Sequence, residues 1–321
     1  NWKVVIGLYL TGAASGITLI ALGLKDLGPI GHILYKSSLE ARFYYWQAAI
    51  RAFKDNFLFG VGLDAFGDYY GRYRTAEAVA WNTQPTNAAH NIYLDYAANG
   101  GIIFLVLNLI LVGWVIKSFI LVVIRDRNFN SEFIALFSGW VAFQAQSIIS
   151  INQIGLALWG WVLSGLIIGF EINTRTDNES ELSPGTSSRL IGQKKLGQSL
   201  SPASLVSVFI AVLIGALVAV PPYVAANKYY KALKSGDALV LQPATYAKPY
   251  DRVRFTFTAS NFAQNGLNDR ALIVIREGVK LFPNSYEAWS VLVGLPNASA
   301  DEITQAKDEM KRLDPFNPDL K

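Results

Sequence analysis

The chain has 321 residues, of which 52% are apolar and only 16% are charged, whereas roughly 25% are charged in an average soluble domain. Mean hydropathy is +0.28 and the apolar residues are grouped in long runs, which argues against two ordinary soluble domains. The net charge of +4 comes from scattered Lys and Arg, so nucleic acid is not expected as a partner, and the lack of cysteine excludes a disulfide framework.

An apolar run begins almost immediately after Asn1. A charged segment, a short apolar stretch and an Ala-x-Ala cleavage site do not occur in that order, so we do not expect a signal peptide. We expect the chain to be a C-terminal portion of a longer protein or the product of a truncated gene.

Long apolar runs recur along the chain. A membrane-spanning helix needs about 20 mostly apolar residues, and its backbone amides must be satisfied within the helix. Five runs meet this requirement: Val4–Leu24, Ile102–Ile124, Phe133–Ile151, Ile154–Ile172 and Ala203–Ala226. The sequence therefore predicts an all-α, polytopic membrane helix bundle with about five spans, and a lipid bilayer as a partner.

Basic residues are unevenly distributed between the short connections. Cytoplasmic loops are enriched in Lys and Arg. Basic residues precede the first run (Lys3), follow the second (Arg125, Arg127) and lie in the linker after the fourth (Arg175, Arg189, Lys194, Lys195), whereas Asn152-Gln153 carries none. A cytoplasmic N-terminus in a bacterial plasma membrane accounts for this distribution.

The predicted organisation follows from these runs and this orientation. It comprises a membrane domain at 1–172 with an extracytoplasmic loop at 25–101, a cytoplasmic linker at 173–202, a final transmembrane helix at 203–226 and an extracytoplasmic helical domain at 227–321.

The segment after Asn227 has ordinary soluble composition. Helices are predicted at 269–281, 285–295 and 300–313, separated by Pro-containing turns. This pattern resembles a degenerate tetratricopeptide array, which implies a surface that binds a protein partner. A small helical cap with no partner explains the pattern equally well.

The loop between the first two runs carries several motifs in a fixed order. Arg42 and Trp46 lie one turn apart on a predicted helix, and Gly60-Val61-Gly62-Leu63 follows as a tight turn. His90-Asn91-x-Tyr93-Leu94 then leads, through six more residues, to Gly101 at the start of the second run.

This order resembles the core of the family of O-antigen ligases, O-antigen polymerases and protein O-oligosaccharyltransferases, over roughly Ser38 to Val115. The resemblance implies transfer of a glycan from an undecaprenyl-diphosphate carrier to a glycan, glycolipid or protein acceptor outside the plasma membrane. The family's important Arg and His match Arg42 and His90. Whole family members have more spans than this chain shows, so part of the carrier cavity would be missing from it.

The residue types suit such chemistry. Arg42 can bind the leaving diphosphate through two parallel hydrogen bonds, and His90 can serve as general base or orient the substrate. Substrate-binding candidates are Arg72, Arg74, Trp46, Asn91 and Tyr93. Each has a structural alternative: a solvated basic turn for the arginines, an interfacial anchor for the aromatic residues, and a cap of the following helix for Asn91.

No metal site or cofactor is predicted. The chain has two His and no Cys, and it has neither an Asp-x-Asp pair nor a phosphate-binding Gly-rich loop. The sequence therefore favours a metal-independent transferase that uses a lipid-linked donor. The alternatives are a protein O-oligosaccharyltransferase and a non-catalytic membrane scaffold whose helical tail binds a partner. A transporter is less favoured, because the chain lacks matching interrupted helices in two halves.

Overall fold

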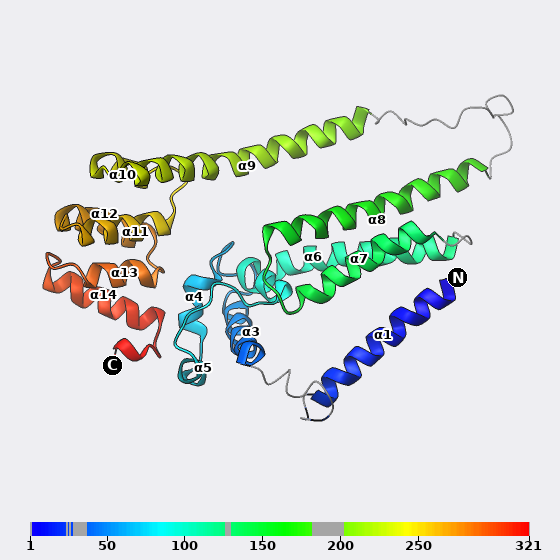
Figure 1. Ribbon diagram of the computed structural model, residues 1–321, viewed down its shortest axis with the longest axis horizontal. Coiled ribbons are helices and arrows are strands. Elements are labelled where there is room, and N and C mark those ends of the chain that lie inside the picture. Colours follow the sequence, from blue (N-terminus) through cyan, green and yellow to red (C-terminus); the bar gives the residue numbers. More distant parts are fainter. Residues whose placement is uncertain are drawn as a thin grey trace. The chain divides into compact units, whose positions relative to one another are not determined.

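The computed structural model describes residues 2–23, 25, 27, 37–125, 130–181 and 202–320 (Figure 1). The chain divides into two compact units, whose main segments are Asn1–Thr186 and Ser187–Pro315. Every regular element in the described ranges is helical, which confirms the predicted all-α class. Arg127, Arg189, Lys194 and Lys195 lie outside the described residues, so their assignment to the cytoplasmic side remains a prediction.

The first unit contains the membrane helices and the motif-bearing loop. Its helices are α1 (Trp2–Gly23), α3 (Ser37–Asp55), α4 (Phe66–Tyr73), α5 (Ala76–Trp81), α6 (Ile92–Arg125), α7 (Ser131–Ser147) and α8 (Ile154–Glu181). In the described chain, four helices are long and apolar enough to cross a bilayer: α1, α6, α8 and α9 (Pro202–Ser235) of the second unit.

The predicted span at Phe133–Ile151 corresponds to a shorter helix. Helix α7 has 17 residues and ends at Ser147, so it rises only about 25 Å. The hydrocarbon core of a bilayer is about 30 Å thick. A turn over residues 148–153 completes the connection to α8.

Aromatic side chains hold the membrane helices together. Helices α6 and α7 both pack against α8 (Figure 1), and the rings of Phe119 and Phe137 stack with their centroids 3.7 Å apart. Helix α1 joins this core through Tyr9, whose hydroxyl lies 2.5 Å from Ser138 Oγ. Arg125 and Glu171 form an ion pair at 2.7 Å that joins α6 to α8.

The second unit is a stack of helices after the membrane-length helix α9. These are α10 (Ala238–Thr245), α11 (Arg252–Gln264), α12 (Asn268–Leu281), α13 (Tyr286–Val293) and α14 (Ala300–Leu313). A 3-10 turn, η1 (Pro318–Leu320), follows them in the chain. The three helices predicted after residue 268 are confirmed, whereas α10 and α11 were not predicted.

The core of the second unit is formed by fully buried side chains from α11 and α12. Phe255, Phe262 and Ile275 have at most 1% of their surface exposed, and complete burial of such a side chain contributes roughly 1.5–3 kcal/mol.

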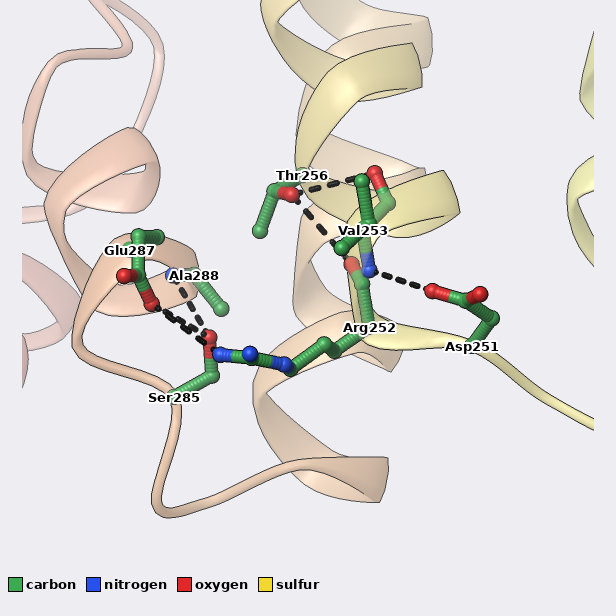
Figure 2. Close-up of polar contacts among 7 residues, drawn as sticks. All are labelled: Asp251, Arg252, Val253, Thr256, Ser285, Glu287 and Ala288. Atoms are coloured by element: carbon green, nitrogen blue, oxygen red, sulfur yellow. Dashed lines mark hydrogen bonds and ion pairs between the residues drawn. The ribbon is translucent and has the colours of Figure 1, made fainter. Parts of the chain in front are cut away.

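Two helix N-termini lie next to each other in this unit (Figure 2). The Asp251 carboxylate accepts from Val253 N at the start of α11, and Ser285 Oγ accepts from Ala288 N at the start of α13. Arg252 and Glu287 lie 3.7 Å apart and link these starts. Such caps satisfy amide groups that would otherwise have no partner, so each helix begins at a defined residue.

Helix α9 is longer than the predicted final span. It continues through Pro221 and Pro222 to Ser235, although each proline lacks the N–H that would donate to the carbonyl four residues earlier. Its last turns carry Tyr229 and Ala232 into the core of the second unit.

Candidate functional site

The motif-bearing loop folds around one face of α3. Ala48, Ala49 and Ala52 of α3 are almost fully buried, and their small side chains let α4 and α6 approach closely. Phe66 and Tyr70 of α4 fill the space between these helices. This small core holds Arg42, at the other end of α3, on a rigid support.

The Gly60-Val61-Gly62 turn binds directly to the backbone of α6. Val61 N donates to Ala98 O at 2.8 Å and Gly62 N to Asn99 O at 3.0 Å. Both glycines have positive φ, and a Cβ on Gly60 would collide with the Ala98–Asn99 backbone. Close approach of two backbones therefore requires a glycine at position 60, whereas Gly62 is favoured by its positive φ alone.

Helix α6 is interrupted where the turn binds it. Gly101 has φ 66° and ψ −166°, and a Cβ there would collide with Leu58. Ile102 N donates to Phe57 O at 2.8 Å, so the loop replaces a helical hydrogen bond at the break. The break separates a short N-terminal segment from the apolar span that follows.

The backbone around His90 is fixed by hydrogen bonds on both sides. Ala89 N donates to Asp95 Oδ1 at 2.7 Å, and Asn91 Oδ1 accepts from Tyr93 N and Leu94 N at 3.0 and 3.1 Å. Asn91 thus caps α6, which is the structural role considered for it in the sequence analysis. His90 itself has φ 54°, a left-handed conformation that is uncommon for residues other than glycine.

His90 lies beside Tyr45 of α3 and within electrostatic reach of Arg42. The His90 and Tyr45 ring centroids are 5.4 Å apart, with the rings tilted by 31°. Partial burial and, to a smaller extent, the positive charge of Arg42 lower the pKa of His90 below 6.5. The imidazole is therefore neutral at neutral pH, the form that can accept a proton.

The Arg42 side chain reaches the turn between α7 and α8. Its Nε donates to Ile149 O at 3.0 Å, which orients the guanidinium from a second element. The sequence analysis proposed Arg42 and His90 as candidates, and the structure places them within electrostatic reach of each other although they are far apart in the chain.

Two tyrosines at the start of α6 also contact the α7–α8 region. Tyr93 OH donates to Gln144 Oε1 at 2.7 Å, and Asn152 Nδ2 donates to Tyr96 OH at 3.2 Å. These side chains line a small pocket of about 30 Å³ between α6, α7 and α8, which has room for about two water molecules. Arg42 and His90 do not line it.

The other predicted substrate-binding residues lie in different surroundings. Arg72 is exposed and its guanidinium lies 5.7 Å from the Tyr73 ring centre. Arg74 is buried and donates to Thr83 O at 2.8 Å, so the alternative of a solvated basic turn is wrong for this residue. Trp46 packs edge-on against Phe43, at a centroid distance of 5.4 Å.

The α7–α8 turn was not predicted as part of the site. It lies more than 50 residues after His90, and it supplies Ile149 O to Arg42 and the Asn152 amide to Tyr96. The pair Asn152-Gln153 in an otherwise apolar region was the only available signal. In the described ranges, no group of three or more His, Cys, Asp or Glu side chains is placed to hold a metal ion.

These features define a multi-pass helical membrane protein in which a conformationally fixed loop presents an arginine and a neutral histidine at one end of the helices. Residues 1–109 match the family model described as O-antigen ligase. No curated protein and no solved structure matches the chain.

The matched segment contains every motif from Arg42 to Gly101, so the resemblance drawn from those motifs is confirmed. It supports a general role in O-antigen or polysaccharide biosynthesis, with an activity of the ligase or glycosyltransferase type.

Proposed function

We propose that the protein transfers a glycan from an undecaprenyl-diphosphate carrier to an acceptor hydroxyl at the outer face of a bacterial plasma membrane. The observation that carries this proposal is that Arg42 lies close enough to His90 for its charge to help lower the pKa of the imidazole, and both residues belong to the segment that matches the O-antigen ligase family. The tetratricopeptide-like tail remains a prediction.

Arg42 would stabilise the leaving group. When the bond between the anomeric carbon and the diphosphate oxygen breaks, the electron pair stays on the diphosphate and its negative charge rises. A guanidinium can meet that charge with parallel hydrogen bonds. The bond from Arg42 Nε to Ile149 O fixes the direction of the side chain before substrate binds, so little reorganisation is needed in the transition state.

His90 would accept the proton of the attacking hydroxyl as the new glycosidic bond forms. Its lowered pKa keeps the imidazole neutral and ready to accept that proton. The positive charge of Arg42 would then oppose the imidazolium that forms, and the departing diphosphate would compensate for this charge.

Exposed polar and aromatic side chains near the pair are candidates for sugar binding. Tyr93 and Trp46 are both partly exposed, and aromatic rings present an apolar face and a polar edge suited to sugars. The acceptor is a glycolipid, a growing glycan or a protein, and we infer no preference among them.

The test is glycan transfer by the full-length protein carrying Arg42→Ala or His90→Ala. We expect transfer from a lipid-diphosphate glycan to fall by roughly 10²–10³-fold without the arginine and by about 10²–10⁴-fold without the base. Arg175→Ala is the matched control, because this arginine is exposed and lies in the last turns of the α8 span.

Equal membrane levels of all variants would show that they insert normally. Wild-type transfer by both the Arg42 and His90 variants would contradict the enzymatic proposal and favour the membrane scaffold.

A further inference from the structure

Helix α9 changes its surroundings at one residue. Every side chain described between Ser204 and Val224 is exposed, whereas Ala225 and Ala232 are only 3% exposed. Tyr229, between them, packs against the core of the second unit, and its hydroxyl lies 3.0 Å from Thr258 Oγ1. Residues 225, 229 and 232 share one helix face, so this face docks on the helical unit.

The same face of α9 continues toward the apolar span, where an open groove separates it from the rest of the second unit. Leu217, Val218, Pro221 and Pro222 form one wall of an open groove of about 730 Å³, and the opposite wall is the connection between α10 and α11. That connection supplies Lys248, Pro249 and Tyr250. Leu217 and Val218 are 67% and 70% exposed, so this wall of the groove is apolar.

The α10–α11 connection is held firmly in place. The buried Arg254 guanidinium donates to Pro249 O, and the Tyr250 ring meets Phe255 edge-on at 6.2 Å. Asp251 caps α11 immediately afterwards. The groove is therefore preformed, with Lys248 Nζ 5.7 Å from the Tyr250 ring centre at its edge.

The length of the apolar run places this groove at the edge of a bilayer. From Ala203 to Ala226 the helix rises about 36 Å, slightly more than the roughly 30 Å of a hydrocarbon core. The next residues are Lys228, Tyr229, Tyr230 and Lys231, which are of the types enriched at the interface. This length predicts that Leu217 to Pro222 lie in the outer half of the hydrocarbon layer.

We propose that this groove binds a phospholipid of the surrounding bilayer. One acyl chain lies along Leu217, Val218 and Pro221, and an anionic headgroup pairs with Lys248. The apolar wall at hydrocarbon depth favours an acyl chain as the occupant, and an exposed ammonium at the interface attracts a negative headgroup. This inference does not depend on whether the protein transfers glycans.

Native mass spectrometry of the purified full chain tests the headgroup. The protein is offered equal amounts of phosphatidylglycerol and phosphatidylcholine with identical acyl chains. We expect preferential retention of phosphatidylglycerol, and a several-fold smaller retained fraction in Lys248→Gln. Lys307→Gln is the matched control, since Lys307 is an exposed lysine on α14. Equal retention by Lys248→Gln and the control would overturn the proposal.

Fluorescence quenching tests the depth of the groove. The chain contains no cysteine, so a label on Tyr250→Cys reports on that position alone. Phospholipids brominated near the top of the acyl chains should quench it, whereas iodide in water should not. A label on Asp301→Cys, at the exposed start of α14, should show the opposite pattern. A Tyr250 label that iodide quenches as strongly as the Asp301 label would also overturn the proposal.

Discussion

At the scale of single residues, His90 combines an uncommon backbone conformation with a lowered pKa. A non-glycine residue at positive φ costs about 1–3 kcal/mol, and here hydrogen bonds to Asp95 and Asn91 on either side compensate for that cost. The ring is thereby placed beside Tyr45, close enough to Arg42 for its charge to act on the imidazole. Small changes in this arrangement should be measurable as changes in titration.

We predict that Arg42→Gln raises the pKa of His90 toward 6.5 without reaching it. The substitution removes the smaller of the two causes of the lowered pKa and leaves the larger one, burial. The chain has only two histidines, so NMR titration of a His32→Gln background observes His90 alone. A pKa unchanged by Arg42→Gln would contradict electrostatic contact between the two side chains.

The same pKa sets the direction of a pH effect on stability. Because the folded-state pKa of His90 is below the unfolded value of about 6.5, the unfolded state binds the proton more readily. His90 therefore reduces stability as pH falls through about 6.5 to the folded pKa, and it has no such effect at higher pH. The same protonation should abolish the ability of His90 to act as a base, so activity should also fall as pH falls below the folded-state pKa.

At the scale of elements, the decisive feature is the docking of the Gly60-Val61-Gly62 turn on the broken start of α6. The turn contributes backbone hydrogen bonds to Ala98 and Asn99. Asn99 in turn accepts from Phe66 N through its side chain at 2.8 Å, which joins α4 to the same point. The turn that follows α3 and the first residue of α4 therefore both bind to the same part of α6.

We predict that Gly60→Ala is destabilising by about 2 kcal/mol or more, because positive φ strain is added to a backbone collision. Gly62→Ala should be milder, since its Cβ would lie 3.5 Å from the nearest atom, Ala65 Cβ. Gly113→Ala, in open space within α6, is the neutral control. Thermal unfolding in detergent measures all three, and equal midpoints for Gly60→Ala and Gly113→Ala would contradict the docking.

At the scale of the whole molecule, connections predicted to share one side of the membrane do meet. The motif-bearing loop contacts the α7–α8 turn through Arg42 and Tyr96, and both were assigned to the outer side from charge. Arg125 and Glu171, at the other end of α6 and α8, form their own pair. The contacts at the two ends of α6 and α8 agree with the orientation that the basic residues predict. Which end lies outside the cell remains a prediction.

We predict that a membrane-impermeant thiol reagent labels Thr83→Cys and Ser150→Cys from the outside of intact cells, but not Ser131→Cys. All three variants are accessible in the protein itself, and the absence of native cysteine removes background labelling. Permeabilised cells should label all three equally. Labelling of Ser131→Cys in intact cells would contradict the proposed topology.

The sequence alone determined the helical class, the apolar spans and the order of motifs, because these depend on local composition and on residue spacing. It also proposed Arg42 and His90 as candidate site residues, since their types and order resemble a known family. Only the tertiary structure decided that the α7–α8 turn orients Arg42, that Arg74 is buried against Thr83, and that the motif glycines permit contact between two backbones. These outcomes depend on contacts between residues far apart in the chain, which local patterns do not encode.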